Sequence, residues 1–210
     1  MKLDNPAVPN LPFAPIVYVT AYHDQFANVL RLYFNRLQNI TQNLVGPNGG
    51  QYLQFPYGSF YDTTDQTAAS TSTAYAITLN TTDLSNGVSV QSSSQITVAQ
   101  DGVYNVQFSV QLSNADNAPQ DIDIWFRKNG TDIANSNTRF GMEKTKGVSD
   151  PYHTVGTVNF LISMDAGDYV QLMWRTSDVD ARIEAYAAGT SPTRPAIPSV
   201  IVTVTFVSES

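Results

Sequence analysis

The chain has 210 residues, 42% of them apolar, with a formal net charge of −7 and no cysteine. This length can bury one good core with a small appendage, and the acidic balance argues against nucleic-acid binding, which needs clustered Lys and Arg. Without cysteine there are no disulfides or thiolate metal sites, and neither a signal peptide nor a stretch of roughly 18 apolar residues indicates export or membrane insertion.

Residues 1 to 19 are predicted to form an extended arm. Four prolines recur in it at an interval of three, which is the period of a polyproline II helix. We expect the arm to dock in a groove on another subunit or another protein, and a stiff spacer is the alternative. The residues predicted to dock are Pro6, Pro9, Leu11, Pro12, Phe13 and Pro15.

Residues 20 to 45 are predicted to form a helix that packs against copies of itself. Thr20 and Asp24 are both suitable N-caps, and the glycine-rich run after Val45 ends the helix. Apolar residues at alternating spacings of four and three form the a and d positions of a heptad stripe. Leu at a with aromatic or β-branched residues at d favours three or four strands, so we expect a trimer; an amphipathic helix on its own β domain is the alternative. The predicted trimer seam comprises Phe26, Leu30, Tyr33, Leu37, Ile40 and Leu44.

After a linker at residues 46 to 56, residues 57 to 210 are predicted to form an all-β head, because the apolar period changes to two. The clearest strand is Tyr104 to Leu112, and Asn129-Gly130 is the strongest hairpin signal. Many short strands at this spacing indicate a sandwich or jelly roll, with long loops at residues 135 to 154 and 189 to 198. Further strands are predicted within residues 75–79, 95–98, 122–126, 158–164, 170–174, 183–186 and 200–206.

The chain offers few groups for catalysis or metal binding. His23 and His153 are its two histidines, and their separation makes a zinc site an unfavoured hypothesis. No P-loop, dinucleotide fingerprint or catalytic triad spacing is present, so we expect neither an enzyme nor a cofactor.

Acidic residues in the head leave two questions open. Asp178 and Asp180, with Glu184, could supply oxygen ligands for calcium, although a solvated loop is the favoured interpretation. Asp121 and Asp123 alternate with apolar residues, so we expect both on the outer face of an exposed strand.

The order of the strands resembles the globular head of the C1q and tumour-necrosis-factor superfamily over residues 57 to 208. A glycine-x-tyrosine-x-phenylalanine motif is matched by Gly102 to Val106, with valine in the phenylalanine position. A late leucine-x-x-glycine-aspartate type of turn is matched by Ile162 to Asp168. The resemblance implies a ten-stranded jelly roll that assembles as a tight trimer. The collagen stalk of that family is absent, and the heptad helix would replace it.

The first fifty residues are similar to virion proteins of marine tailed phages. The similarity lies in the proline-rich start, Asn5 to Pro12, and in the helix segments Tyr22 to Phe26 and Arg31 to Leu37. Together the two resemblances imply a homotrimeric virion protein assembled in the host cytoplasm. Its expected task is capsid decoration or a fibre, with the arm contacting other virion proteins. A tail-fibre protein that recognises a host surface glycan or protein is the alternative, and a carbohydrate-active enzyme or esterase is disfavoured because no convergent acid pair is evident.

Overall fold

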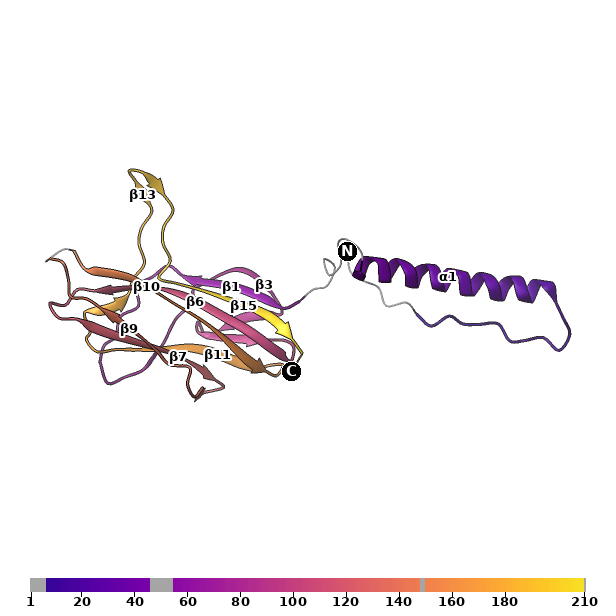
Figure 1. The fold of residues 1–210 in the computed structure, drawn as a ribbon, viewed down its shortest axis with the longest axis horizontal. Coiled ribbons are helices and arrows are strands. Elements are labelled where there is room, and N and C mark those ends of the chain that lie inside the picture. The colour runs from indigo at the N-terminus through magenta and orange to yellow at the C-terminus, as the bar shows by residue number, and fades with distance from the viewer. Residues whose placement is uncertain (1–6, 46–54, 148–149, 210) are drawn as a thin grey trace. The chain divides into compact units, whose positions relative to one another are not determined.

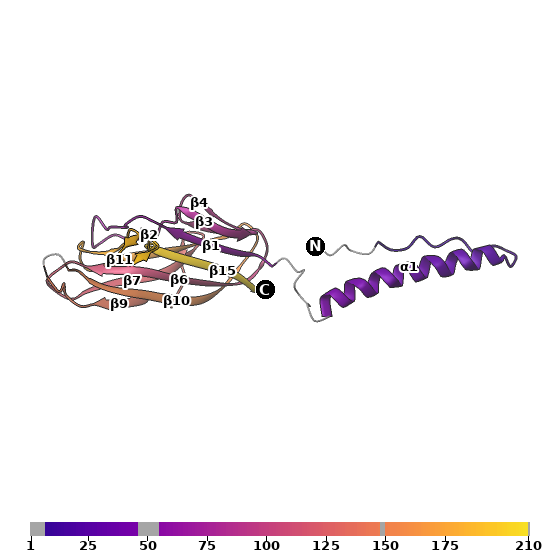
Figure 2. The same ribbon diagram turned by 90° about the horizontal axis from the view of Figure 1, so that it is seen from above.

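The computed structural model describes residues 7–45, 55–147 and 150–209 (Figures 1 and 2). The chain divides into two compact units, Met1–Gln54 and Phe55–Ser210. The predicted docking residue Pro6 and residues 46–54 of the predicted linker lie outside the described residues.

The first unit consists of the helix α1 (Thr20–Val45) and the arm that precedes it. The backbone amides of Tyr22 and His23 donate to the carbonyl oxygen of Val19, at 3.1 and 3.4 Å, which closes the first turn. Followed from Val19 toward the N-terminus, the arm lies along the helix (Figures 1 and 2). Its residues Ala7 to Pro9 share a shallow depression with Val29, Leu32, Tyr33 and Arg36 of α1. The helix therefore occupies the segment expected from the heptad stripe, while its role in association stays a prediction.

The second unit is a β sandwich, which confirms the prediction of a mainly β fold. Its two antiparallel sheets enclose one core, and the rings of Phe108 and Phe126 meet across it with centroids 5.9 Å apart. The first sheet has the order β10 (Tyr152–Met164), β6 (Gly102–Asn114), β15 (Val200–Ser208), β1 (Tyr57–Asp62), β3 (Thr81–Asn86), with β12 (Ala181–Ile183) paired to β6. The second has the order β4 (Val88–Gln91), β5 (Gln95–Val98), β11 (Tyr169–Thr176), β7 (Gln120–Lys128), β8 (Thr131–Asp132), with β2 (Tyr75–Ala76) on β11 and β9 (Thr138–Met142) on β7.

Strand β6 is the centre of the first sheet, and its pattern is the one that the sequence predicts. Its inward side chains are almost fully buried, and β10 pairs with it over its whole length, from Tyr152 opposite Asn114 to Met164 opposite Gly102. The residues that alternate into the core are Tyr104, Val106, Phe108, Val110 and Leu112.

The predicted hairpin at Asn129-Gly130 is also confirmed. Both residues have positive φ, 48° and 81°, and they join β7 to β8. Asparagine and glycine tolerate this left-handed backbone at little cost, and its twist matches that of the paired strands.

Two segments expected to be loops contain strands. Residues 138–142 form β9, which pairs with β7, so the prediction of a loop over residues 135–154 is wrong there. The strand is held by this long-range pairing and by half-buried Phe140, whereas Arg139 and Gly141 interrupt the apolar alternation. Within residues 189–198, β13 (Gly189–Thr190) and β14 (Thr193–Arg194) form a separate hairpin.

The chain enters the head beside the last strand. β1 and β15 are antiparallel, with Asp62 opposite Val200. The amide of Phe206 donates to the carbonyl oxygen of Pro56 at 3.0 Å, and the rings of Phe55 and Phe206 stack with centroids 5.8 Å apart.

Candidate functional site

The heptad stripe of α1 is incompletely covered within one chain. Leu37 and Leu44 are 37% and 39% exposed, although leucines at a and d positions are normally buried between helices. The arm shares its depression with Val29, Leu32 and Arg36 and with one seam residue, Tyr33, whereas Leu37 and Leu44 remain accessible. The remaining predicted seam residues are half-buried: Phe26, Leu30, Tyr33 and Ile40.

The predicted docking residues of the arm differ in how much they contact their own chain. Phe13 is 99% exposed and Leu11 is 42% exposed, and Pro15 is exposed too. Pro9 and Pro12 are half-buried, and Pro9 borders the depression shared with α1. The arm therefore presents Phe13 to solvent while it is held to its own helix nearer its start.

The outward side chains of residues 155–161 of β10, 105–111 of β6, 201–205 of β15 and 57–61 of β1 form a surface that we name the uncharged face. Leu161 on β10 lies opposite Asn105 on β6, which in turn lies opposite Thr205 on β15. The buried Oδ1 of Asn105 has no hydrogen-bond partner in the described part of the chain. None of the residues of this face is charged: Tyr57, Ser59, Tyr61, Asn105, Gln107, Ser109, Gln111, Val155, Thr157, Asn159, Leu161, Ile201, Thr203 and Thr205.

The outer face of the second sheet has a different character, because it carries paired charges. The carboxylate of Asp123 on β7 accepts from Nε of Arg139 on β9 and from Nε of Arg175 on β11, both at 2.8 Å. The side chain of Asp123 is only 4% exposed. The expectation that Asp121 and Asp123 are both exposed is therefore wrong for Asp123: it does lie on the outer face, but the two arginines cover it.

The arginines also control the ionisation of Asp123. The hydrogen bond from Arg139 lowers its pKa, burial opposes this, and the hydrogen bond and charge of Arg175 lower it further. The net result is a pKa below the ordinary value for aspartate, so the group is ionised at neutral pH.

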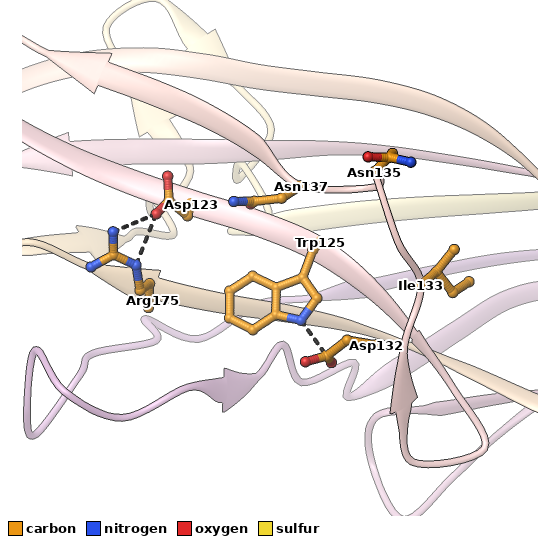
Figure 3. A pocket seen from close by; sticks show the side chains of 7 residues that line it. All are labelled: Asp123, Trp125, Asp132, Ile133, Asn135, Asn137 and Arg175. Atoms are coloured by element: carbon orange, nitrogen blue, oxygen red, sulfur yellow. Dashed lines mark hydrogen bonds and ion pairs between the residues drawn. The ribbon is translucent and has the colours of Figure 1, made fainter.

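Next to this ion pair lies a depression of about 310 Å³, which we name the Trp125 depression (Figure 3). Figure 3 shows the indole of Trp125 broadside, surrounded by polar side chains. Its Nε1 donates to Oδ1 of Asp132 at 2.8 Å, and the same oxygen pairs with Nε of Arg127 at 2.6 Å. The depression is lined by Asp123, Trp125, Asp132, Ile133, Asn135, Asn137 and Arg175.

A buried serine holds the loop on one side of the Trp125 depression. Oγ of Ser136 accepts from the amide of Phe126 at 3.0 Å and donates to the carbonyl oxygen of Ile133 at 2.8 Å. Asn135 and Asn137, on either side of it, are exposed, and Asn135 has a φ of 61°. The sequence pattern does not predict this site, although a tryptophan at an outward position of β7 is a visible signal.

His153 belongs to a polar cluster at the end of the first sheet. Its Nδ1 lies 2.7 Å from the hydroxyl of Tyr186, which also contacts Glu184 at 3.1 Å. Arg182 donates to the other carboxylate oxygen of Glu184 at 2.6 Å. Burial raises the pKa of Glu184, but the surrounding donors outweigh it and the pKa lies below its ordinary value. Burial and the neighbouring charge of Glu184 raise the pKa of Tyr186.

These contacts bear on the calcium and zinc hypotheses. Glu184 is occupied by Arg182 and Tyr186, and Oδ1 of Asp178 accepts from the amide of Asp180 at 2.9 Å. His23 stacks on Tyr18 in the first unit. Among the described residues, no group of three or more His, Asp or Glu side chains is arranged to hold a metal ion.

Comparison with known proteins does not identify the chain. Its sequence matches no protein-family model, and no curated protein matches it significantly. In the described part of the chain, no helix has both the length and the apolar character needed to cross a membrane.

Proposed function

We propose that the protein is a homotrimeric phage virion structural protein, which decorates the capsid or forms a fibre and is anchored by its N-terminal arm. The observation that carries the proposal is the heptad stripe of α1, on which Leu37 and Leu44 remain exposed in a single chain. Burying such a stripe between parallel helices would remove its apolar surface from water. The assignment to a virion rests on the resemblance of the first fifty residues.

The strand order of the head supports a C1q/TNF-like jelly roll. The first sheet places β6 between β10 and β15, and the second places β7 and β11 side by side, so that strands distant in sequence alternate between two antiparallel sheets. The uncharged face supports association of the heads, because charged residues are depleted at the cores of protein interfaces. An orphan acceptor, Oδ1 of Asn105, also lies on this face.

The oligomeric state is the direct test. Sedimentation equilibrium of the purified full chain at micromolar concentration should give three times the 23.0 kDa chain mass. A monomer would exclude the proposal, and a stable dimer would contradict both the heptad assignment and the jelly-roll resemblance. Cryo-electron microscopy of intact particles would then show whether the trimer lies on the capsid or on the tail.

A second candidate function is receptor binding, in which the head recognises a glycan or protein on the host surface. The Trp125 depression favours it, because an accessible aromatic ring among polar side chains is typical of recognition sites. Purified protein that performs this function should compete with particles for host cells and reduce adsorption. If saturating protein leaves adsorption unchanged, this second function is excluded while the structural role remains.

A further inference from the structure

We propose that the Trp125 depression binds an uncharged saccharide of one or two rings, whose apolar face stacks on the indole. This inference deepens the receptor-binding function and rests on it. It concerns only the head, and it does not depend on the trimer seam.

The indole of Trp125 is fixed in position, as a stacking platform requires. Asp132 accepts from its Nε1 at 2.8 Å, and Met173 lies directly opposite it on β11. Figure 3 shows the broad face of the ring rather than its edge. A rigid aromatic ring offers a large contact area at low cost in conformational entropy, and the C–H groups on one side of a pyranose ring form a matching apolar surface.

The side chains around the ring suit hydroxyl groups. Asn135 and Asn137 each present an amide, which both donates and accepts, and both residues are exposed. Sugar hydroxyls likewise donate and accept. Arg175 adds further N–H groups on the side of the indole away from Asn135 and Ile133, as Figure 3 shows.

Each charged side chain that lines the depression is already paired, which favours a neutral ligand. Asp123 is paired with Arg139 and Arg175, and Asp132 with Arg127. An anionic sugar would have to compete with carboxylates already bound to these arginines. The volume of about 310 Å³ lies at the lower end of the roughly 300–1,000 Å³ of small-molecule pockets, so it suits a short saccharide.

The polar loop is organised before any ligand arrives. Buried Ser136 ties it to Phe126 and Ile133 through two hydrogen bonds, and Asn135 and Asn137 flank this anchor. A site that is already ordered loses less entropy on binding, which raises affinity for a small ligand.

The test uses tryptophan fluorescence of the full chain. The protein has two tryptophans, and Trp174 is only 1% exposed, so a ligand that stacks on the accessible indole should report through Trp125. The probes are methyl glycosides of glucose, galactose, mannose and N-acetylglucosamine, their disaccharides, and N-acetylneuraminic acid as the anionic comparison. We expect at least one neutral glycoside to give a saturable change, and N-acetylneuraminic acid to give none.

Variants assign the binding to this site. Because Trp125→Ala removes the reporter as well as the platform, its binding is followed by ligand-observed NMR, where saturation transfer should disappear. Asn137→Ala should weaken binding roughly fivefold to tenfold through the loss of a hydrogen bond. Asn117→Ala, which truncates an exposed asparagine outside the depression, is the matched control and should bind as the parent does. Circular dichroism establishes that each variant is folded.

Three outcomes would overturn the inference. They are the absence of binding to any neutral probe, binding that persists in folded Trp125→Ala, and binding of the anionic sugar alone. If the protein blocks adsorption of particles but binds no glycoside, the receptor function stands and its ligand is a protein. If glycosides bind but adsorption is not blocked, the saccharide site stands and the receptor function fails.

Discussion

The carboxylate of Asp123 is the most enclosed charge on the outer face of the second sheet. Its ion pairs join three strands, because Arg139 on β9 and Arg175 on β11 approach Asp123 from either side of β7. Side chains that are far apart in the sequence therefore join the central strand to both neighbours. The arginines themselves are 58% and 41% exposed, so water can solvate them when the carboxylate is removed.

Replacing Asp123 with Asn should destabilise the head by about 2 kcal/mol, because hydrogen bonds to a charged group are lost while the arginines can be rehydrated. Urea unfolding followed by tryptophan fluorescence measures the change. The matched control is Asp121→Asn, whose carboxylate is 43% exposed and lies 3.8 Å from Nη1 of Arg139. Equal free energies of unfolding of the two variants would show that the enclosure of Asp123 by the arginines does not stabilise the head.

Asp168 gives the head a defined sensitivity to acid. Lys128, Asn129 and the amide of Asp165 donate to it, and these hydrogen bonds lower its pKa from 3.8 to about 2. A pKa that is lower in the folded state means that the stabilisation is fully present above the unfolded value of 3.8 and is lost as the pH falls toward 2.

Asp168→Asn should therefore reduce the loss of stability of the head between about pH 4 and pH 2. Unfolding curves of the variant and the parent across this range measure the slope. Asp165→Asn, in the same turn, is the control, since the structure assigns to Asp165 only a backbone contact with Asp168. An unchanged slope in Asp168→Asn would contradict the assignment.

At the scale of elements, the heptad stripe can be tested against a neighbouring position of the same helix that lies outside the stripe. Leu37→Asp places an unpaired carboxylate in the seam of each chain, and burying it should cost roughly 2 kcal/mol per chain or more. We expect the helix to dissociate from its copies, which sedimentation and the helical circular dichroism signal would report. Gln38→Asp, on an exposed neighbouring position, should assemble as the parent does. If both variants behave alike, α1 packs through another face.

The sequence predicts elements best where burial is one-sided. Strand β6 alternates cleanly because one side faces the core. Strand β9 was missed because its place depends on pairing with β7, which local pattern cannot encode. The Trp125 depression was missed because it too depends on contacts beyond the local pattern. The sequence singles out Trp125 as a tryptophan on an outward strand position. Asn135 and Asn137 come close to it because buried Ser136 folds the loop back onto Phe126.

For the whole molecule, the division into two units predicts that the arm is separable from folding. Deleting residues 1–19 removes no residue of the head core, which lies within the second unit. We expect a folded trimer that no longer incorporates into particles, as judged by thermal unfolding, sedimentation and occupancy on purified virions. If the truncated protein occupies virions at the normal level, the segment that anchors it lies in the helix or the head. Failure to fold would mean that the contact between the arm and α1 is part of the structural core.

The pairing of β1 with β15 decides where foreign sequence could be attached to this protein. Because Phe55 stacks on Phe206, cargo fused after the last strand would emerge beside the point where the chain enters the head. The hairpin of β13 and β14 precedes β15 and lies toward the strand's other end (Figure 1), so a guest peptide inserted there would be displayed away from the point where the chain enters the head.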